Sequence, residues 1–511
     1  MSVSQHPPLQ FNGWRPDRPG WIFGLTTPSL IALGAVAAWP LMGFWLQRYW
    51  MALAGVVFWG LVAVATVWRP LGRPSSAWAF AWLLWKWADV RGLNVFQSRL
   101  MSEGVVMDMN EPDLPGQLQR LVFHDGPSIP GHGPLGLIYD PAQRTWTFVA
   151  RVTPRGLGLS TPEEKAALVA GRADLLATLG ASGGYIRQMV ELVRTLPDDG
   201  ATAFEWQTRN WNPDAPLAAR QAVGELMELH ATTGVRTESF LVIQLDEDRA
   251  KRAADAAGGR AAGYGRVAAR TAGVMGASIG AAGFDDVAWM SGQDIVRATK
   301  DGLSPLDAGS REQARVAARS AGLPEPRGSW ALAGPGMAVN EWGVYLHGGM
   351  ATVTFAIALH PERNLPLDAL GALMATTVTG EQRSIAVYHQ PKSAREADRA
   401  VAGEQYQRDA VIEGKRKRSF RVSIKERKAY ARAERAEMEI SAGHTLERAA
   451  INLSVSVPVG EALDDAVESA IATARRFGMS PERMWGSQDS GFFATALPFG
   501  MGLPPVRKLS S

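Results

Sequence analysis

Two apolar runs separated by only four residues constrain the fold of this chain more than any other feature. The first extends from Ile22 to Leu46, and the second, Met51 to Trp68, has 18 residues and no charge. As a helix, the second run would be about 27 Å long, close to the thickness of a hydrocarbon layer. The connection is so short that the two helices must be antiparallel. The sequence therefore predicts a transmembrane hairpin at residues 21–68, with a pair of buried core helices as the alternative.

The distribution of charge predicts the orientation of this hairpin. The first hundred residues contain eight Lys or Arg and two Asp or Glu, and the connection contributes only Arg48. Because basic residues stay on the cytoplasmic side, we expect a bacterial inner-membrane protein with two spans and both termini in the cytoplasm. Eleven of the 18 tryptophans lie between residues 14 and 87. Indole rings favour the interface of a lipid bilayer, and the residues expected there are Trp21, Trp45, Trp50, Trp68, Trp78, Trp82 and Trp85.

The segments around the hairpin are too polar or too short to span. Residues 1–20 are expected to be an N-terminal cytoplasmic arm. Residues 69–100 contain three tryptophans at helical spacing between Ala77 and Trp87, which predicts an interfacial helix, with a partial third span as the alternative. Residues 101–134 are rich in Gly, Pro and Asp and are expected to be a linker.

The remaining chain shows two similar rounds of predicted elements, at residues 135–335 and 336–511. Each round runs strand, strand, helix, strand, helix; examples are a helix at 215–230 and a strand at 236–245. The order predicts an α+β fold of cytoplasmic ferredoxin-like sandwich domains, with duplication left open. The second round also contains a long charged helix at about 393–441.

Motifs that carry chemistry are not found in the sequence. There is no cysteine, and no glycine-rich loop ends in the Lys-Ser or Lys-Thr pair of a phosphate-binding motif. The nearest candidate, Gly258 to Gly265, has no lysine and is expected to be a packed Gly/Ala helix. We therefore predict no catalytic residue, no cofactor-binding residue and no metal site.

The segment from Arg408 to Arg435 is strongly basic, with eleven basic and four acidic residues. A solvated helix face explains such a run, and so does contact with anionic lipid, an acidic partner or nucleic acid. Only Phe420 and Tyr430 interleave, which disfavours a base-stacking surface. The residues expected to contact a partner or lipid are Lys415, Arg416, Lys417, Arg418, Arg421 and Lys425.

Three short motifs carry a resemblance to a known family. They are Gly13-Trp14-Arg15, the charged run Arg432 to Glu439 before Gly443-His444, and the ending from Gln488 to Gly500 with its Leu497-Pro498. This layout resembles an integral-membrane family of high-GC Gram-positive bacteria associated with conjugation and type IV secretion. In that family a PrgI-like two-helix segment is fused to a domain similar to the N-terminal part of the secretion ATPase. The ATPase continues into a nucleotide domain, whereas this sequence ends at Ser511.

The resemblance implies a non-catalytic, membrane-anchored structural or docking component of a conjugation or type IV secretion-like machine. Its expected partners are a separate secretion ATPase and other membrane subunits, in a hetero-oligomer. An EccE-type component of type VII secretion, a membrane-tethered nucleic-acid-binding protein and an enzyme with a membrane-near substrate are the alternatives.

Overall fold

A computed structural model of the chain describes residues 10–11, 27–68, 75–102, 108–109, 111–156, 158, 160–181, 184–198, 200–359, 365–366, 368–378, 380–392, 438 and 447–502. Within them, thirteen strands form one antiparallel sheet in the order β2-β9-β10-β11-β14-β13-β6-β7-β5-β4-β3, with β8 added on β5 and β15 on β11. The strands are β2 (Val95–Gln97), β3 (Val122–Ile129), β4 (Gly133–Asp140), β5 (Thr145–Pro154), β6 (Ile186–Pro197), β7 (Val235–Asp246), β8 (Phe284–Trp289), β9 (Met337–Asn340), β10 (Tyr345–His347), β11 (Met350–Leu359), β13 (Gln382–Pro391), β14 (Glu447–Pro458) and β15 (Met479–Arg483); a separate pair joins β1 (Gln10–Phe11) and β12 (Leu365–Pro366).

The sheet consists of two halves with the same order of pairing. In the first half the order is β8-β5-β7-β6, and in the second it is β15-β11-β14-β13. A helix follows the first strand of each half, α4 (Pro162–Ala181) or α11 (Ala369–Leu373), and another precedes the last strand, α8 (Arg260–Ala281) or α14 (Leu463–Arg476). Strands β6 and β13 pair with each other and join the halves. The predicted α+β class is confirmed, with a large antiparallel sheet as its main feature.

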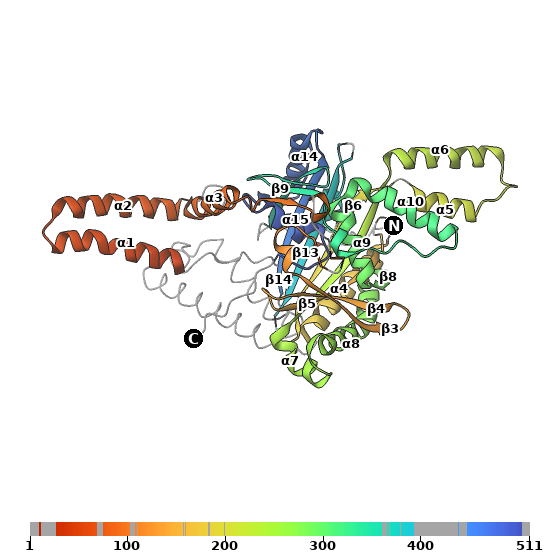
Figure 1. Ribbon diagram of the computed structural model, residues 1–511, viewed down its shortest axis with the longest axis horizontal. Helices are drawn as coiled ribbons and strands as arrows, with labels where there is room; N and C mark the ends of the chain where they lie inside the picture. Colours follow the sequence, from red (N-terminus) through yellow and green to blue (C-terminus); the bar gives the residue numbers. More distant parts are fainter. Residues whose placement is uncertain are drawn as a thin grey trace, which may run out of the picture.

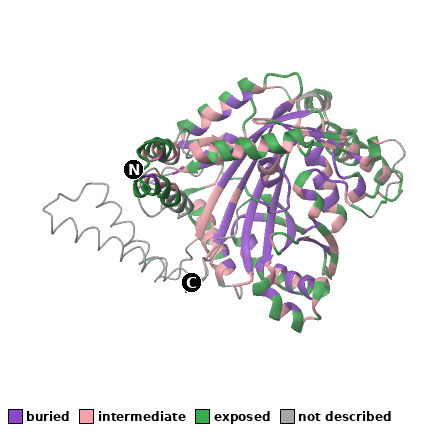
Figure 2. Cartoon of the chain, turned by 60° about the vertical axis from the view of Figure 1, so that its left-hand side comes forward, coloured by how far each residue is buried: buried purple, intermediate pink, exposed green. Residues whose placement is uncertain are grey.

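Both faces of the sheet are covered near its centre, as Figure 2 shows by the buried colour of the long strands. Alternate residues of β7 enter different cores because successive side chains of a strand point to opposite faces. Leu241 and Ile243 pack with α4 and α8, whereas Phe240 and Val242 pack on the other side with α9 (Gly292–Leu303) and α15 (Gln488–Ala496). The unbroken apolar run of this strand is therefore explained by burial on two sides.

The C-terminal segment that carries the family resemblance is part of this core. Phe493 and Leu497 are fully buried. The hydroxyl of Tyr388 on β13 donates to the Met501 carbonyl oxygen at 2.6 Å, and the amide of Gln244 on β7 donates to the Phe499 carbonyl oxygen at 3.2 Å. The segment thus bonds to strands of both halves and fastens them together.

The apolar runs form a hairpin of α1 (Thr27–Trp45) and α2 (Tyr49–Val67) that projects from the sheet in Figure 1. The two helices lie close, since a Cβ at Gly43 would be 2.6 Å from the Ala52 nitrogen. Across the residues that the structure describes, neither of these helices, nor any other, combines the length and the apolar character that crossing a bilayer requires. The expected two-span inner-membrane location with cytoplasmic termini is therefore wrong.

Two further expectations concern the N-terminal third, and the first of them is wrong. The presumed linker at 101–134 includes a 3-10 helix at Gly116–Arg120 and strand β3, which pairs with β4. Leu118 is fully buried in the core, so this region belongs to the folded body. The predicted helix at 77–87 is present as α3 (Ser75–Val90), but part of it packs on protein, as described below.

Candidate docking surface

A helical hairpin is inserted between β6 and β7, in the connection that joins these two neighbouring strands. It consists of α5 (Ala201–Arg209) and α6 (Leu217–Thr233), and we call residues 201–233 the arm. Figure 1 shows the arm projecting from the sheet at the end away from α1 and α2. The arm begins at Gly200, whose φ of +75° favours glycine. The loop between the helices contains Pro213 and Pro216, which suit a turn.

The arm exposes large apolar side chains that a helix normally buries. On α5, Phe204 is 63% exposed and Trp206 is 67% exposed. On α6, Leu226 and Leu229 are 60% and 58% exposed. Single exposed apolar residues are ordinary, but several of them on one projecting element make it a candidate interaction surface.

The exposed residues of α6 follow a regular pattern. Ala219, Ala222, Leu226 and Leu229 are exposed at spacings of three, four and three residues. This is the spacing of a helix-packing seam in a coiled coil. We call these four residues the α6 seam. The partly covered residues of the same helix, Arg220, Gly224 and Met227, lie on a different face.

The base of the arm is fixed to α10 (Ala308–Ser320) by polar contacts. The Glu205 carboxylate of α5 lies 3.1 Å from the Arg319 guanidinium. The Thr202 hydroxyl donates to Glu312 at 3.3 Å. Glu312 also accepts a hydrogen bond from Arg315 at 2.8 Å. The first two contacts join α5 to α10, and the third holds the Glu312 carboxylate in place, so the base of the arm is attached to the body of the protein.

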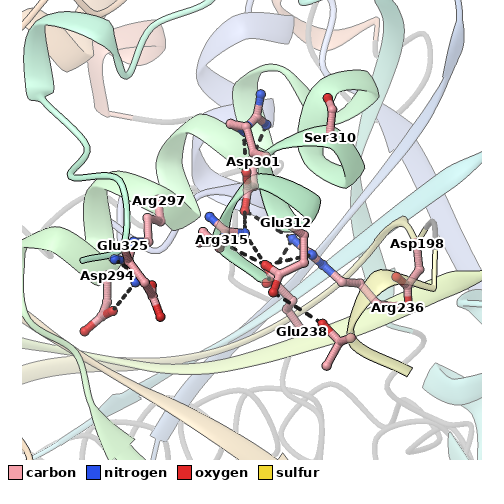
Figure 3. A network of polar contacts seen from close by, with 12 residues as sticks. Asp198, Arg236, Glu238, Asp294, Arg297, Asp301, Ser310, Glu312, Arg315 and Glu325 are labelled. Atoms are coloured by element: carbon pink, nitrogen blue, oxygen red, sulfur yellow. Dashed lines mark hydrogen bonds and ion pairs between the residues drawn. The ribbon is translucent and has the colours of Figure 1, made fainter. Parts of the chain in front are cut away.

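A larger ion-pair network continues from α10 into the body of the protein (Figure 3). Arg236 of β7 reaches Asp301 of α9 at 3.1 Å and Glu312 at 3.9 Å. Asp301 is only 3% exposed and also accepts a hydrogen bond from Arg311 at 2.9 Å. The network therefore links the sheet, α9, α10 and the base of the arm.

The most deeply buried ion pair of this region joins β6 to β7. Arg194, which is 1% exposed, donates to Glu238 at 2.7 Å and to the carbonyl oxygens of Ala298 and Ala496 at 2.7 and 2.9 Å. Burial alone would raise the pKa of Glu238. The positive charges of Arg194, Arg151 and Arg236 outweigh burial and lower that pKa to about 2. Glu238 is therefore a carboxylate at every physiological pH.

The ion pairs of the network are suited to holding together the elements that they join. Its carboxylates are paired with guanidinium groups, and Glu312 also has a lowered pKa, because hydrogen bonding and charge from Arg315 and its neighbours outweigh burial. In the part of the chain that the structure describes, no three His, Asp or Glu side chains are grouped as a metal would need. His124 and Asp125, which are adjacent on β3, and His132, which follows that strand, do not form such a group.

The tryptophans predicted at a membrane interface divide into three groups. Trp21 lies outside the described residues. Trp45, Trp50, Trp68 and Trp82 are exposed, as predicted for an interface but without evidence for one. Trp78 and Trp85 instead pack on Trp342, with ring centroids 6.4 and 5.7 Å apart, and the Trp85 indole donates to the Asn340 carbonyl oxygen at 3.1 Å. Part of each of these two rings therefore contacts protein, and contact with headgroups stays a prediction.

The predicted basic contact residues, Lys415, Arg416, Lys417, Arg418, Arg421 and Lys425, lie outside the described residues, and so does most of the predicted charged helix at 393–441. The arm was not predicted as a site. The sequence does contain its signal, which is the spacing of Ala219, Ala222, Leu226 and Leu229. That spacing indicates a packed stripe, and only the structure shows that these four residues are exposed.

Comparison with known proteins does not identify a family. No protein-family model matches the chain, and no curated protein is significantly similar to it in sequence.

Proposed function

We propose that this chain is a non-catalytic docking subunit of a conjugation or type IV secretion-like machine, and that the arm is the surface through which it binds another subunit. The observation that carries the proposal is the exposure of Phe204, Trp206, Leu226 and Leu229 on an element whose base is fixed by ion pairs. A fixed base lowers the entropy lost on binding, because the backbone that carries the apolar residues needs no ordering when a partner binds.

The fold supports this proposal at a finer level. We propose that the halves are two ferredoxin-like units, because the strand order β8-β5-β7-β6 and its counterpart β15-β11-β14-β13 are both those of a split βαβ sandwich. In each unit the second and third strands are adjacent in the sheet. The arm occupies that connection in the first unit, and residues 392–446 occupy it in the second. An insertion at this position can contact a partner without disturbing the sheet.

The family resemblance suggests a separate ATPase as the partner. We place this partner on the arm as part of the proposal, within a hetero-oligomer. The test is affinity purification of the full-length chain from its native host after chemical crosslinking. Mass spectrometry should identify a secretion ATPase or another subunit of the same machine at a fixed ratio.

The decisive comparison uses variants of exposed residues. Trp206→Ser with Leu226→Ser should remove the co-purified subunit and reduce substrate transfer in the host, while the amount of the chain stays normal. Val274→Ser is the matched control, since Val274 is 63% exposed on α8, outside the arm. Retention of the subunit by the arm variant, or equal loss with the control, would contradict the proposal.

A further inference from the structure

The α6 seam has the spacing that selects a helix as its partner. Side chains repeated at three and four residues form ridges along one face of a helix, and such ridges pack best into the grooves of a second helix. The seam residues cover three turns; Ala219 and Ala222 at one end are small, and Leu226 and Leu229 at the other are large. A flat sheet or an extended peptide does not match this taper.

The charge beside the seam indicates which charge the partner should carry. Glu225 is exposed and directly precedes Leu226, so it occupies a flanking position of the seam. On the opposite flank stands Val223, which is also exposed and carries no charge. The exposed tip of the arm adds Asp214. A partner helix with Lys or Arg along the flank facing Glu225 would match this surface.

A second copy of the chain matches it less well in either direction. Antiparallel pairing of two α6 helices would set Leu226 against Ala222 of the second copy, but would bring Glu225 next to Glu225 of the second copy. Parallel pairing would set Ala219 and Ala222 against the same residues of the second copy, which leaves unfilled space between the helices. Like charges and unfilled space both weaken association.

We propose that the α6 seam binds an amphipathic helix of the partner subunit, in which Lys or Arg flanks an apolar stripe. This inference rests on the proposed docking function and specifies the chemistry of its partner. The Leu226 and Leu229 side chains supply the apolar contact, and Glu225 supplies the charge that orients the bound helix.

Two synthetic four-heptad helices provide the test. Both carry Leu and Ala in the apolar stripe, and they differ only in having Lys or Glu at every flanking position. Fluorescence anisotropy of the labelled helices is measured with the full-length chain. The Lys helix should bind about twofold to fivefold more tightly than the Glu helix, which is the range expected for one exposed ion pair. Leu226→Ser with Leu229→Ser should weaken binding of the Lys helix at least tenfold.

Reversing the charge of Glu225 distinguishes specific docking from nonspecific hydrophobic binding. Glu225→Lys should invert the preference, so that the Glu helix binds more tightly. Equal binding of both helices, an unchanged preference in Glu225→Lys, or a chain that dimerises through the seam and dissociates on Leu226→Ser would overturn the inference. If these experiments fail while the arm variant still loses its co-purified subunit, the docking function stands and only the chemistry of the partner is refuted.

Discussion

Glu238→Gln is the substitution that tests most sharply how the base of the arm is stabilised. The variant keeps the size and hydrogen-bonding shape of the side chain and removes its charge. Arg194, Arg236 and Arg151 then face a neutral group inside the protein. Removing one partner of a buried ion pair leaves the other charge without compensation, which costs roughly 3–5 kcal/mol.

The pKa of Glu238 gives an independent magnitude. Lowering the pKa from 4.5 to about 2 on folding corresponds to roughly 3 kcal/mol of stability, at 1.36 kcal/mol for each factor of ten. Because the pKa is lower in the folded state, this stability is complete well above pH 4.5 and is lost as the pH falls toward 2. The destabilisation by Glu238→Gln should therefore be roughly 3 kcal/mol at pH 7 and about half of that near pH 3.

Urea unfolding followed by tryptophan fluorescence measures this difference at each pH. Asp285→Asn is the matched control, because Asp285 and its partner Arg155 are 48% and 55% exposed, and such a pair contributes less than about 1 kcal/mol. A destabilisation by Glu238→Gln below about 1 kcal/mol at pH 7, or one that is the same at pH 7 and pH 3, would refute the assignment of Glu238 as a paired, charged anchor.

Two other predictions concern the core. Burial lowers the pKa of His347 to about 4; since this is below its value in the unfolded chain, stability should fall by roughly 3 kcal/mol as the pH drops from 7 to 4. In urea titrations His347→Gln should flatten that dependence, and an unchanged slope would show that His347 does not cause it. Gly171→Ala should destabilise by about 1–3 kcal/mol, because its Cβ would lie 2.0 Å from the Ala281 carbonyl oxygen, whereas Gly276→Ala, with open space around it, should stabilise by up to about 1 kcal/mol. Equal melting temperatures for these two variants would contradict the packing of α4 on α8.

The regular elements were predictable because their periodicity is local. The helix expected at 215–230 is α6, and the strand expected at 236–245 is β7. The packed Gly/Ala helix expected near Gly258 is α8, in which Gly263 lies against the Ala254 backbone. In each case the apolar or small residues repeat at the spacing of the element that they form.

The strand β3 was hidden by its composition. It contains Gly126 and Pro127, which indicate a loop when read alone. The pairing of β3 with β4 shifts register between Asp125 and Ser128, so Gly126 and Pro127 fall in a bulge. Proline and glycine are tolerated there because β3 is the last strand of the sheet and a bulge leaves groups unpaired.

The ion-pair network could not be predicted from the sequence at all. Its members include Arg194, Arg236, Asp301 and Glu312, which come from four separate elements. No spacing rule connects them, because their proximity depends on the pairing of β6 with β7 and on the packing of α9 and α10. The same dependence on tertiary structure explains why the contacts of Trp78 and Trp85 with Trp342 could not be predicted.

Site-specific photocrosslinking in the native host tests the central claim, that the arm is a docking surface, most directly. The photoreactive residue p-benzoylphenylalanine replaces Leu226 on the arm or, as a control, the exposed Lys251 on α7. We expect one defined adduct from position 226, identified as a subunit of the same machine, and none from position 251. No adduct at position 226, or the same products from both positions, would contradict it.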